Sequence, residues 1–256
     1  MTSRRTPSTR QGQGVAFKVA IAGGILAGLA ALSMAGAGPA YRLEMLSLGE
    51  AFSLLRYGAL VALGAAGLGA VSLLIAAFTR RALPALLAAL VILAGLALVA
   101  VPWQQLQQAR SVPPIHDITT DLEDPPAFEA LVEAREVAPN AVAYPGEATA
   151  KQQREGYPGL GPLVLQAPPA AVREAVGAVA REAGWEIAAV TDGRLEATDT
   201  TFWFGFKDDV VIRLSETDDG VRVDMRSASR LGTSDVGTNA ARIRSTLEAL
   251  EARVGG

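Results

Sequence analysis

The stretch that decides the architecture is residues 82–103, ALPALLAALVILAGLALVAVPW, which contain no charged side chain. Two further charge-free runs precede it, residues 19–41 and residues 57–79. Each run is long enough to cross the ~30 Å hydrocarbon core of a bilayer as one α-helix. A buried helix of a soluble protein would carry a polar face, which these runs lack. The sequence therefore predicts a three-helix transmembrane anchor over residues 19–103, with the lipid bilayer as its partner.

Charge is divided unevenly along the chain. Residues 1–110 hold nine Lys and Arg against two Asp and Glu, a net charge of +7, whereas residues 111–256 hold 14 against 24, a net charge of −10. Basic residues gather in the predicted cytoplasmic N-terminus, residues 1–18, and in the Arg80-Arg81 turn. Short loops rich in Lys and Arg stay in the cytoplasm. With three spans, we expect a multi-pass protein of the inner membrane whose C-terminal domain is periplasmic or otherwise extracytoplasmic.

The first run also has a second interpretation, as a signal peptide cleaved after Ala35-Gly36-Ala37. Its apolar region is longer than that of a usual signal peptide, so we favour a retained helix. Cleavage would leave the C-terminal domain on the same side of the membrane. No ionisable residue lies deep in any span, which argues against an ion-coupled transporter. Small residues recur at helical spacing and allow an oligomer, although packing within the anchor itself is favoured: Gly24, Gly28, Gly58, Ala62, Ala66 and Ala70.

A proline-rich strap follows the anchor over residues 104–159. Of the 14 prolines, 11 fall between Pro102 and Pro169, which excludes one long helix. The strap is richer in Ile, Phe and Val than a flexible linker, so we expect it to pack on the following domain from Ile115 onward. Asp124 is predicted to cap a helix that begins at Pro125 and runs toward Arg135.

The last segment, residues 160–256, is predicted to be an α+β domain with an antiparallel sheet and helices on one face. A short strand at 163–165 precedes a helix that opens at Pro168 and ends at Gly184. Strands from Trp185 and from Leu195 flank a turn at Asp192-Gly193, and a further hairpin turns at residues 218–220. Asp208-Asp209 is expected to break the aromatic run of residues 202–206, before a strand that alternates from Val210. The closing helix is expected to begin at residue 234 or 235 and to reach Val254.

Four aromatic residues crowd into residues 202–206, FWFGF. We expect Phe202, Phe204 and Phe206 to face the core while Trp203 covers the strap or a helix. The alternative is that Trp203 lies on the surface as a contact for a membrane or a partner.

Two segments resemble a known family. Residues 113–121, PPIHDITTD, followed by DPPAF at 124–128, resemble the opening signature of domain of unknown function 1499, and residues 226–243 are similar to its closing signature. The resemblance covers residues 111–253. It implies a bacterial domain that is often attached to membrane spans and has no established activity, so no catalytic residue can be transferred.

The closing signature holds our candidate ligand-binding residues. Hydroxyls, guanidinium groups and a helix N-terminus together can hold a phosphate or carboxylate. One hypothesis is therefore a pocket for a small anionic ligand or lipid headgroup. The favoured alternative is that the arginines pair with carboxylates and clamp the strap. The residues concerned are Arg226, Ser227, Ser229, Arg230, Ser234, Asp235, Asn239 and Arg242.

His116, Asp117 and Asp121 allow a catalytic hypothesis, as a general base or as one His and two carboxylates around a metal. Ser227 or Ser229 would then be the nucleophile. A lone His is more often simply hydrogen-bonded, so we expect no metal and no cofactor. The absence of cysteine excludes a thiol nucleophile and a Cys-ligated metal. The charge of −10 disfavours nucleic acid and predicts weak attraction to anionic lipid surfaces.

The leading hypothesis is a non-enzymatic, membrane-tethered domain that binds a small ligand or a protein of the cell envelope. The first alternative is an extracytoplasmic hydrolase that uses His116 and Asp117 with the segment Arg226–Arg242. The second is a structural subunit of a membrane complex, in which the three helices are the interaction surface.

Overall fold

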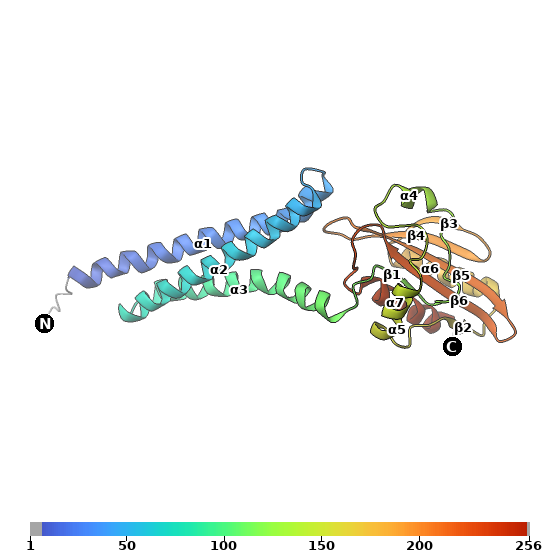
Figure 1. Cartoon of the computed structure of the whole chain (residues 1–256). Coiled ribbons are helices and arrows are strands. Elements are labelled where there is room, and N and C mark those ends of the chain that lie inside the picture. The colour runs from blue at the N-terminus through green and yellow to red at the C-terminus, as the bar shows by residue number, and fades with distance from the viewer. Residues whose placement is uncertain (1–6, 255–256) are drawn as a thin grey trace. The chain divides into compact units, whose positions relative to one another are not determined.

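The computed structural model describes residues 7–254, and it divides into two compact units after Leu106 (Figure 1). Arg4 and Arg5 of the predicted cytoplasmic segment lie outside the described residues. The first unit holds the three predicted helices, α1 (Pro7–Arg42), α2 (Leu48–Phe78) and α3 (Ala82–Ser111). All three are long and apolar enough to cross a membrane. The chain is therefore built as a multi-pass membrane protein with a second, separate unit.

Helix α3 continues eight residues beyond Trp103 and ends at Ser111. The glutamines at 104–108 extend the helix because Gln is a good helix former. Extended chain therefore begins at Val112 and not at residue 104, where we had expected the strap to start.

Small residues let the three helices approach one another closely. A Cβ atom added to Gly58 would lie 2.4 Å from Cγ of Met34, and one added to Gly95 would lie 2.7 Å from the carbonyl oxygen of Ala62. Gly28, by contrast, has open space around its Cα. Gly58 and Ala62, two members of the predicted series, thus pack among the helices of this chain.

The second unit is built on a six-stranded antiparallel sheet of order β1-β6-β5-β4-β3, with β2 also paired to β6. Strand β1 pairs with residues 226–228 of β6 and β2 pairs with residues 221–223, so the two short strands share one edge. The strands are β1 (Asp117–Thr119), β2 (Leu163–Leu165), β3 (Glu186–Val190), β4 (Arg194–Thr200), β5 (Lys207–Thr217) and β6 (Gly220–Ser229).

One face of the sheet packs on α6 (Pro169–Glu182) and α7 (Thr238–Val254). The stripe of α6, which includes Val172 and Val176, contacts the same core as Val210 and Ile212 of β5. Pro169 lies in the first turn of α6, and Gly184 has a φ of +76° just beyond its end. Both helix boundaries therefore agree with the expectation from sequence.

The strap covers the opposite face of the sheet. Phe128 and Leu131 form a second core with Val211 and Ala228. Val211 lies between Val210 and Ile212, and because successive residues of a strand point to opposite faces, this second core faces away from α6 and α7. Two short helices interrupt the strap, α4 (Val132–Glu136) and α5 (Glu147–Gly156).

Three local expectations were wrong. The helix expected from Pro125 begins only at Val132, because the amides of Glu129 and Leu131 donate to the buried Glu196 carboxylate, at 2.8 and 3.0 Å, in place of helical carbonyls. Strand β5 starts at Lys207, so Asp208 and Asp209 lie within it.

The closing helix begins at Thr238, because Val236 and Gly237 have positive φ values of 56° and 86° that no helix accommodates.

The aromatic run also departs from the expected alternation. Phe204 is buried, but Phe202 is 92% exposed. Residues 202–204 form a turn between β4 and β5, so the two-residue period of a strand does not apply to them.

Candidate functional site

The two signature segments meet in the fold, because β1 carries the first and β6 carries the second. Asp117 lies opposite Ala228 in the register and Arg226 lies opposite Thr119, so Asp117 and Arg226 are diagonal neighbours on the same face of the sheet. The Arg226 guanidinium donates to both oxygens of the Asp117 carboxylate, from Nε at 2.9 Å and from Nη2 at 2.8 Å, and the two residues are 2% and 1% exposed. Arg226 also donates to the carbonyl oxygens of Pro126 and Val142. One buried ion pair therefore joins β6, β1 and the strap.

A second buried arginine, Arg135, comes from α4 and was not foreseen. It donates to Asp209 Oδ2 at 2.9 Å and to the carbonyl oxygen of Ala228 at 3.0 Å. The Phe128 ring lies 4.7 Å from the guanidinium carbon of Arg135 and 4.7 Å from that of Arg226. Burial lowers the pKa of Arg135 below its usual range, although the hydrogen bond that Arg135 donates to Asp209 opposes the shift. Asp209 also accepts from Arg230 at 2.8 and 2.9 Å, which raises the pKa of Arg230.

Asp121 forms a separate cluster at the start of the strap. Its Oδ1 accepts from the amides of Glu123 and Asp124, and its Oδ2 accepts from Arg213 and Arg222. Partial burial would raise the pKa of this carboxyl, but the two amides and the two guanidinium groups outweigh it, and the pKa is lowered.

On the opposite face of the sheet, Arg242 of α7 lies over Ser227. The Ser227 hydroxyl donates to Asn239 Oδ1 at 2.7 Å and accepts from Arg242 at 2.8 Å. Arg242 donates further to Asn239, Asp199 and Asp208. These bonds use all five N–H groups of the guanidinium, so no donor is left for an external anion.

The start of α7 is closed by its own side chains. Asp235 accepts from the amide of Gly237 at 2.9 Å and from that of Asn239 at 2.7 Å. Burial is the main cause that raises the pKa of Asp235. Ser234 accepts from the amide of Val236, and Ser229 accepts from the Asn239 side chain. The amides that an external anion would use are therefore already bonded to Asp235.

The eight candidate residues of the closing signature do not form one pocket. Alternation along β6 directs Arg226 and Arg230 toward the strap, and Ser227 and Ser229 toward α7. Sequence reasoning had gathered them because they are neighbours in the chain.

His116 is held by its backbone. Its carbonyl oxygen accepts from the amide of Ser229 and from the side chain of Asn239. Its ring Nδ1 is buried, and within residues 14–254 no hydrogen bond reaches that atom. His116, Asp117 and Asp121 do not form a group able to hold a metal ion, nor does any other set of His, Asp and Glu in the described part of the chain.

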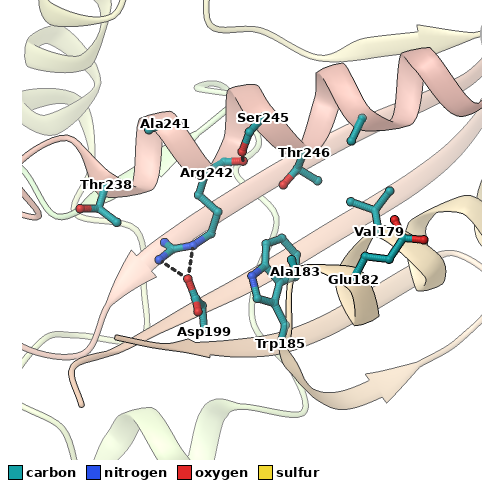
Figure 2. Close-up of a pocket in the computed structure, with 11 residues that line it drawn as sticks. Val179, Glu182, Ala183, Trp185, Asp199, Thr238, Ala241, Arg242, Ser245 and Thr246 are labelled. Carbon is teal, nitrogen blue, oxygen red and sulfur yellow. Dashed lines mark hydrogen bonds and ion pairs between the residues drawn. The ribbon is translucent and has the colours of Figure 1, made fainter. Parts of the chain in front are cut away.

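A groove of about 680 Å³ lies between α6 and α7, and Arg242 is the one predicted site residue that lines it. Figure 2 shows Arg242 reaching from α7 to Asp199 at the end of β4, with Trp185 beside this pair. Asp199 and Trp185 had not been singled out as site residues, since a strand-end carboxylate and a core tryptophan carry no distinctive signal. The remaining lining residues are Val179, Glu182, Ala183, Thr238, Ala241, Ser245, Thr246 and Ala249.

Fold and sequence together define a class of protein, an α+β domain carried by three apolar membrane-spanning helices. The chain belongs to the family described as "Protein of unknown function (DUF1499)", whose model matches residues 117–250. The match begins at β1 and so includes the strap as well as the sheet. No curated protein matches the chain.

Proposed function

We propose that this protein is a ligand-binding module of the cell envelope, held in the inner membrane with its second unit on the extracytoplasmic side. The observation that carries the proposal is the groove between α6 and α7, which combines an aromatic wall at Trp185 with a partly exposed carboxylate at Asp199. Ligand pockets typically pair an apolar lining with a few placed polar groups. The orientation rests on the excess of Lys and Arg in the short loops that flank the helices.

The hydrogen bonds around Asp199 indicate the chemistry of the ligand. Arg242 bonds Oδ2 of Asp199 twice, whereas among the described residues no hydrogen bond reaches Oδ1, and the Asp199 side chain is 31% exposed. Since all five N–H groups of Arg242 are already bonded, an anion would have to displace Asp199. A neutral or cationic donor, such as an amine or a hydroxyl, needs no such displacement. We therefore propose a small amphipathic ligand with a donor at Asp199 and an apolar part against Trp185.

The buried pairs outside the groove support a structural role for the other candidates. Arg226 and Arg230 have carboxylate partners, and Asp235 caps α7. The hydrolase alternative finds less support, because both oxygens of Asp117 accept from Arg226 and the Ser227 hydroxyl is bonded to Asn239 and Arg242.

The test uses Trp185 as a reporter in the full chain. In a Trp103→Phe/Trp203→Phe variant in lipid nanodiscs, Trp185 is the remaining tryptophan. We expect hexylamine and phenethylamine to change its emission saturably, whereas hexanoate and 3-phenylpropionate, with matched carbon skeletons, leave it unchanged.

Two alanines of α7 supply a matched pair of variants. Ala249 lines the groove and Ala252 does not, and both are exposed. Ala249→Phe should abolish the response by filling the groove, and Ala252→Phe should preserve it. A response that is absent from both ligand series, or that survives in Ala249→Phe, would contradict the proposal.

A further inference from the structure

Two carboxylates line the groove between α6 and α7, one toward each end. Asp199, at the end of β4, accepts from Arg242 of α7. Glu182, at the end of α6, accepts from Arg253, about three turns further along α7. Figure 2 shows the Trp185 ring between the two carboxylates. The groove thus has an acidic group toward each end and an aromatic wall between them.

The end of the groove at Asp199 has more negative than positive charge. Arg242 donates to Asp199 and to the buried Asp208, in each case at 2.7 Å, and its Nη1 bonds to neutral side chains. One guanidinium therefore serves two carboxylates, and this hydrogen-bonded group has a net charge of −1. Burial raises the pKa of Asp235, and the negative charge of Asp208 raises it further. Because a partly buried charge without a partner is unfavourable, a cation at the exposed oxygen of Asp199 would be stabilising.

The second carboxylate is open to solvent. Both oxygens of Glu182 accept from Nη2 of Arg253, at 2.8 and 3.0 Å, and the Glu182 side chain is 65% exposed. An exposed ion pair of this kind is weak, since water and salt screen it. A cationic group in the groove can therefore compete with Arg253 for Glu182.

Apolar groups line the groove between the two acidic groups. They include Val179 and Ala183 of α6 and the wall formed by Trp185. From Arg242 to Ala249, the last lining residue of α7, the helix rises about 10 Å. With bonds of about 1.5 Å, an extended chain of eight carbons with a nitrogen at each end spans a comparable distance. The apolar part therefore suits a methylene chain that reaches from one carboxylate toward the other.

The balance of charge across the groove selects cations over anions. Among the described residues that line it, Asp199 and Glu182 are acidic and Arg242 alone is basic. Because the guanidinium of Arg242 is fully bonded within the protein, a carboxylate on the ligand would meet like charge without gaining a donor.

We propose that the groove recognises linear molecules with a cationic amine at each end and an apolar chain between them, the class of the long α,ω-diamines. One ammonium group binds the exposed oxygen of Asp199, the second binds Glu182 in place of Arg253, and the chain lies along Trp185. This inference rests on the proposed function and adds to it the second charge and the length of the ligand.

The test compares probes that share one chain and differ at its second end. Emission of Trp185 is titrated in the full-length Trp103→Phe/Trp203→Phe protein, in nanodiscs of zwitterionic phosphatidylcholine that do not concentrate cations at the lipid surface. The probes are 1,8-diaminooctane, 8-amino-1-octanol and 8-aminooctanoate. We expect the diamine to bind about two- to fivefold more tightly than the amino alcohol, as for an exposed ion pair, and the amino acid to bind least tightly. The short 1,4-diaminobutane should have no advantage over 4-amino-1-butanol.

Three variants locate the second ammonium group. Glu182→Gln should make the dissociation constants of the eight-carbon diamine and amino alcohol equal. Glu174→Gln is the matched control, because Glu174 is an exposed residue of the same helix that does not line the groove, and this variant should keep the advantage of the diamine. Arg253→Met removes the competing guanidinium and should increase that advantage.

The possible outcomes separate this inference from the proposed function. If hexylamine changes the emission of Trp185 but the diamine binds no more tightly than the amino alcohol, the groove is a ligand site and the diamine class is wrong. If no amine changes the emission, the proposed function fails as well. An advantage of the diamine that survives Glu182→Gln, or that Glu174→Gln removes equally, would overturn the place given to the second ammonium group.

Discussion

At the residue scale, the buried ion pairs show why the charged residues of the two signature segments have a structural role. Asp117 and Arg226 are almost completely buried, yet each carboxylate oxygen has a guanidinium donor, and two further N–H groups of Arg226 donate to strap carbonyls. A buried pair adds little net stability compared with apolar residues, but removing one partner leaves an uncompensated charge. These residues are therefore expected to be intolerant of single changes whether or not the protein binds a ligand.

Asp117→Ala is expected to lower the free energy of unfolding by about 3–5 kcal/mol, because Arg226 then remains charged without its partner. Urea denaturation of the full chain in detergent, followed by tryptophan fluorescence, measures the loss. The Asp117→Ala/Arg226→Met double variant should lose less than the sum of the two single variants. Arg253→Met supplies the control, since its pair with Glu182 is exposed and worth at most about 1 kcal/mol. Equal losses for the buried and exposed pairs would be inconsistent with this account.

Asp121 makes the stability of the strap depend on pH. Its pKa in the folded protein is lowered, so its contribution is present above its ordinary pKa of about 3.9 and is lost as the pH falls through the lowered value. Asp121→Asn should therefore lower the melting temperature at pH 7, and the two proteins should converge once the pH has fallen below the lowered pKa of Asp121. Thermal unfolding followed by circular dichroism across this range provides the measurement. A difference that persists undiminished at low pH would show that charge is not its origin.

At the element scale, turns decide where strands and helices begin. Gly220 closes the β5–β6 hairpin with a φ of +127°, and an added Cβ would lie 2.4 Å from the carbonyl oxygen of Leu165 in β2. This contact is between strands distant in sequence. A turn was predicted here from residues 218–220, but the close approach of β2 depends on the sheet.

Gly220→Ala is expected to destabilise the domain by about 1–3 kcal/mol, through backbone strain and the clash with β2. Gly193, in the β3–β4 turn, is the matched control because its φ is not in the strained range and an added Cβ would be 3.4 Å from its nearest neighbour. Gly193→Ala should change the melting temperature little. Similar effects of both substitutions in thermal denaturation would refute the assignment of the strain to Gly220.

The helices of the second unit also show where a local sequence pattern was sufficient to predict a boundary and where distant contacts overrode it. The boundaries of α6 could be predicted because Pro169 and Gly184 act on the chain locally. The start of α4 could not, since the amides before it bond to Glu196, a residue 65 positions away from Leu131. Glu196 lies between Leu195 and Ala197, which face the helix-covered core, so the alternation of the strand predicts that Glu196 is exposed to solvent. The strap covers it instead, and it is fully buried.

At the scale of the whole molecule, the strap is part of the domain. It supplies β1, Phe128 and Arg135, and the family match begins at residue 117. A boundary at residue 160, as we predicted from composition, would separate Arg226 from Asp117. We therefore infer that the folding unit is residues 107–256.

A fragment of residues 107–256, which lacks α1, α2 and all but the last five residues of α3, should express as a soluble protein and unfold cooperatively on heating. Its acidic charge favours solubility. Residues 160–256 should fail this test, because Asp117 and the strap side of the core are missing. Circular dichroism and thermal unfolding of both fragments give the comparison. A shorter fragment with equal stability would show that the strap is dispensable.

The sequence by itself determined the three membrane-spanning helices, the α+β class, the boundaries of α6 and the family. These depend on hydrophobicity, periodicity and local turn chemistry, which neighbours in the chain carry. Only the tertiary structure decided which charged residues pair. The alternation of β6 separates Arg226 from Ser227, and α7 and β4 join Arg242 to Asp199 beside Trp185. Such pairings arise between residues far apart in the chain, so no local pattern encodes them.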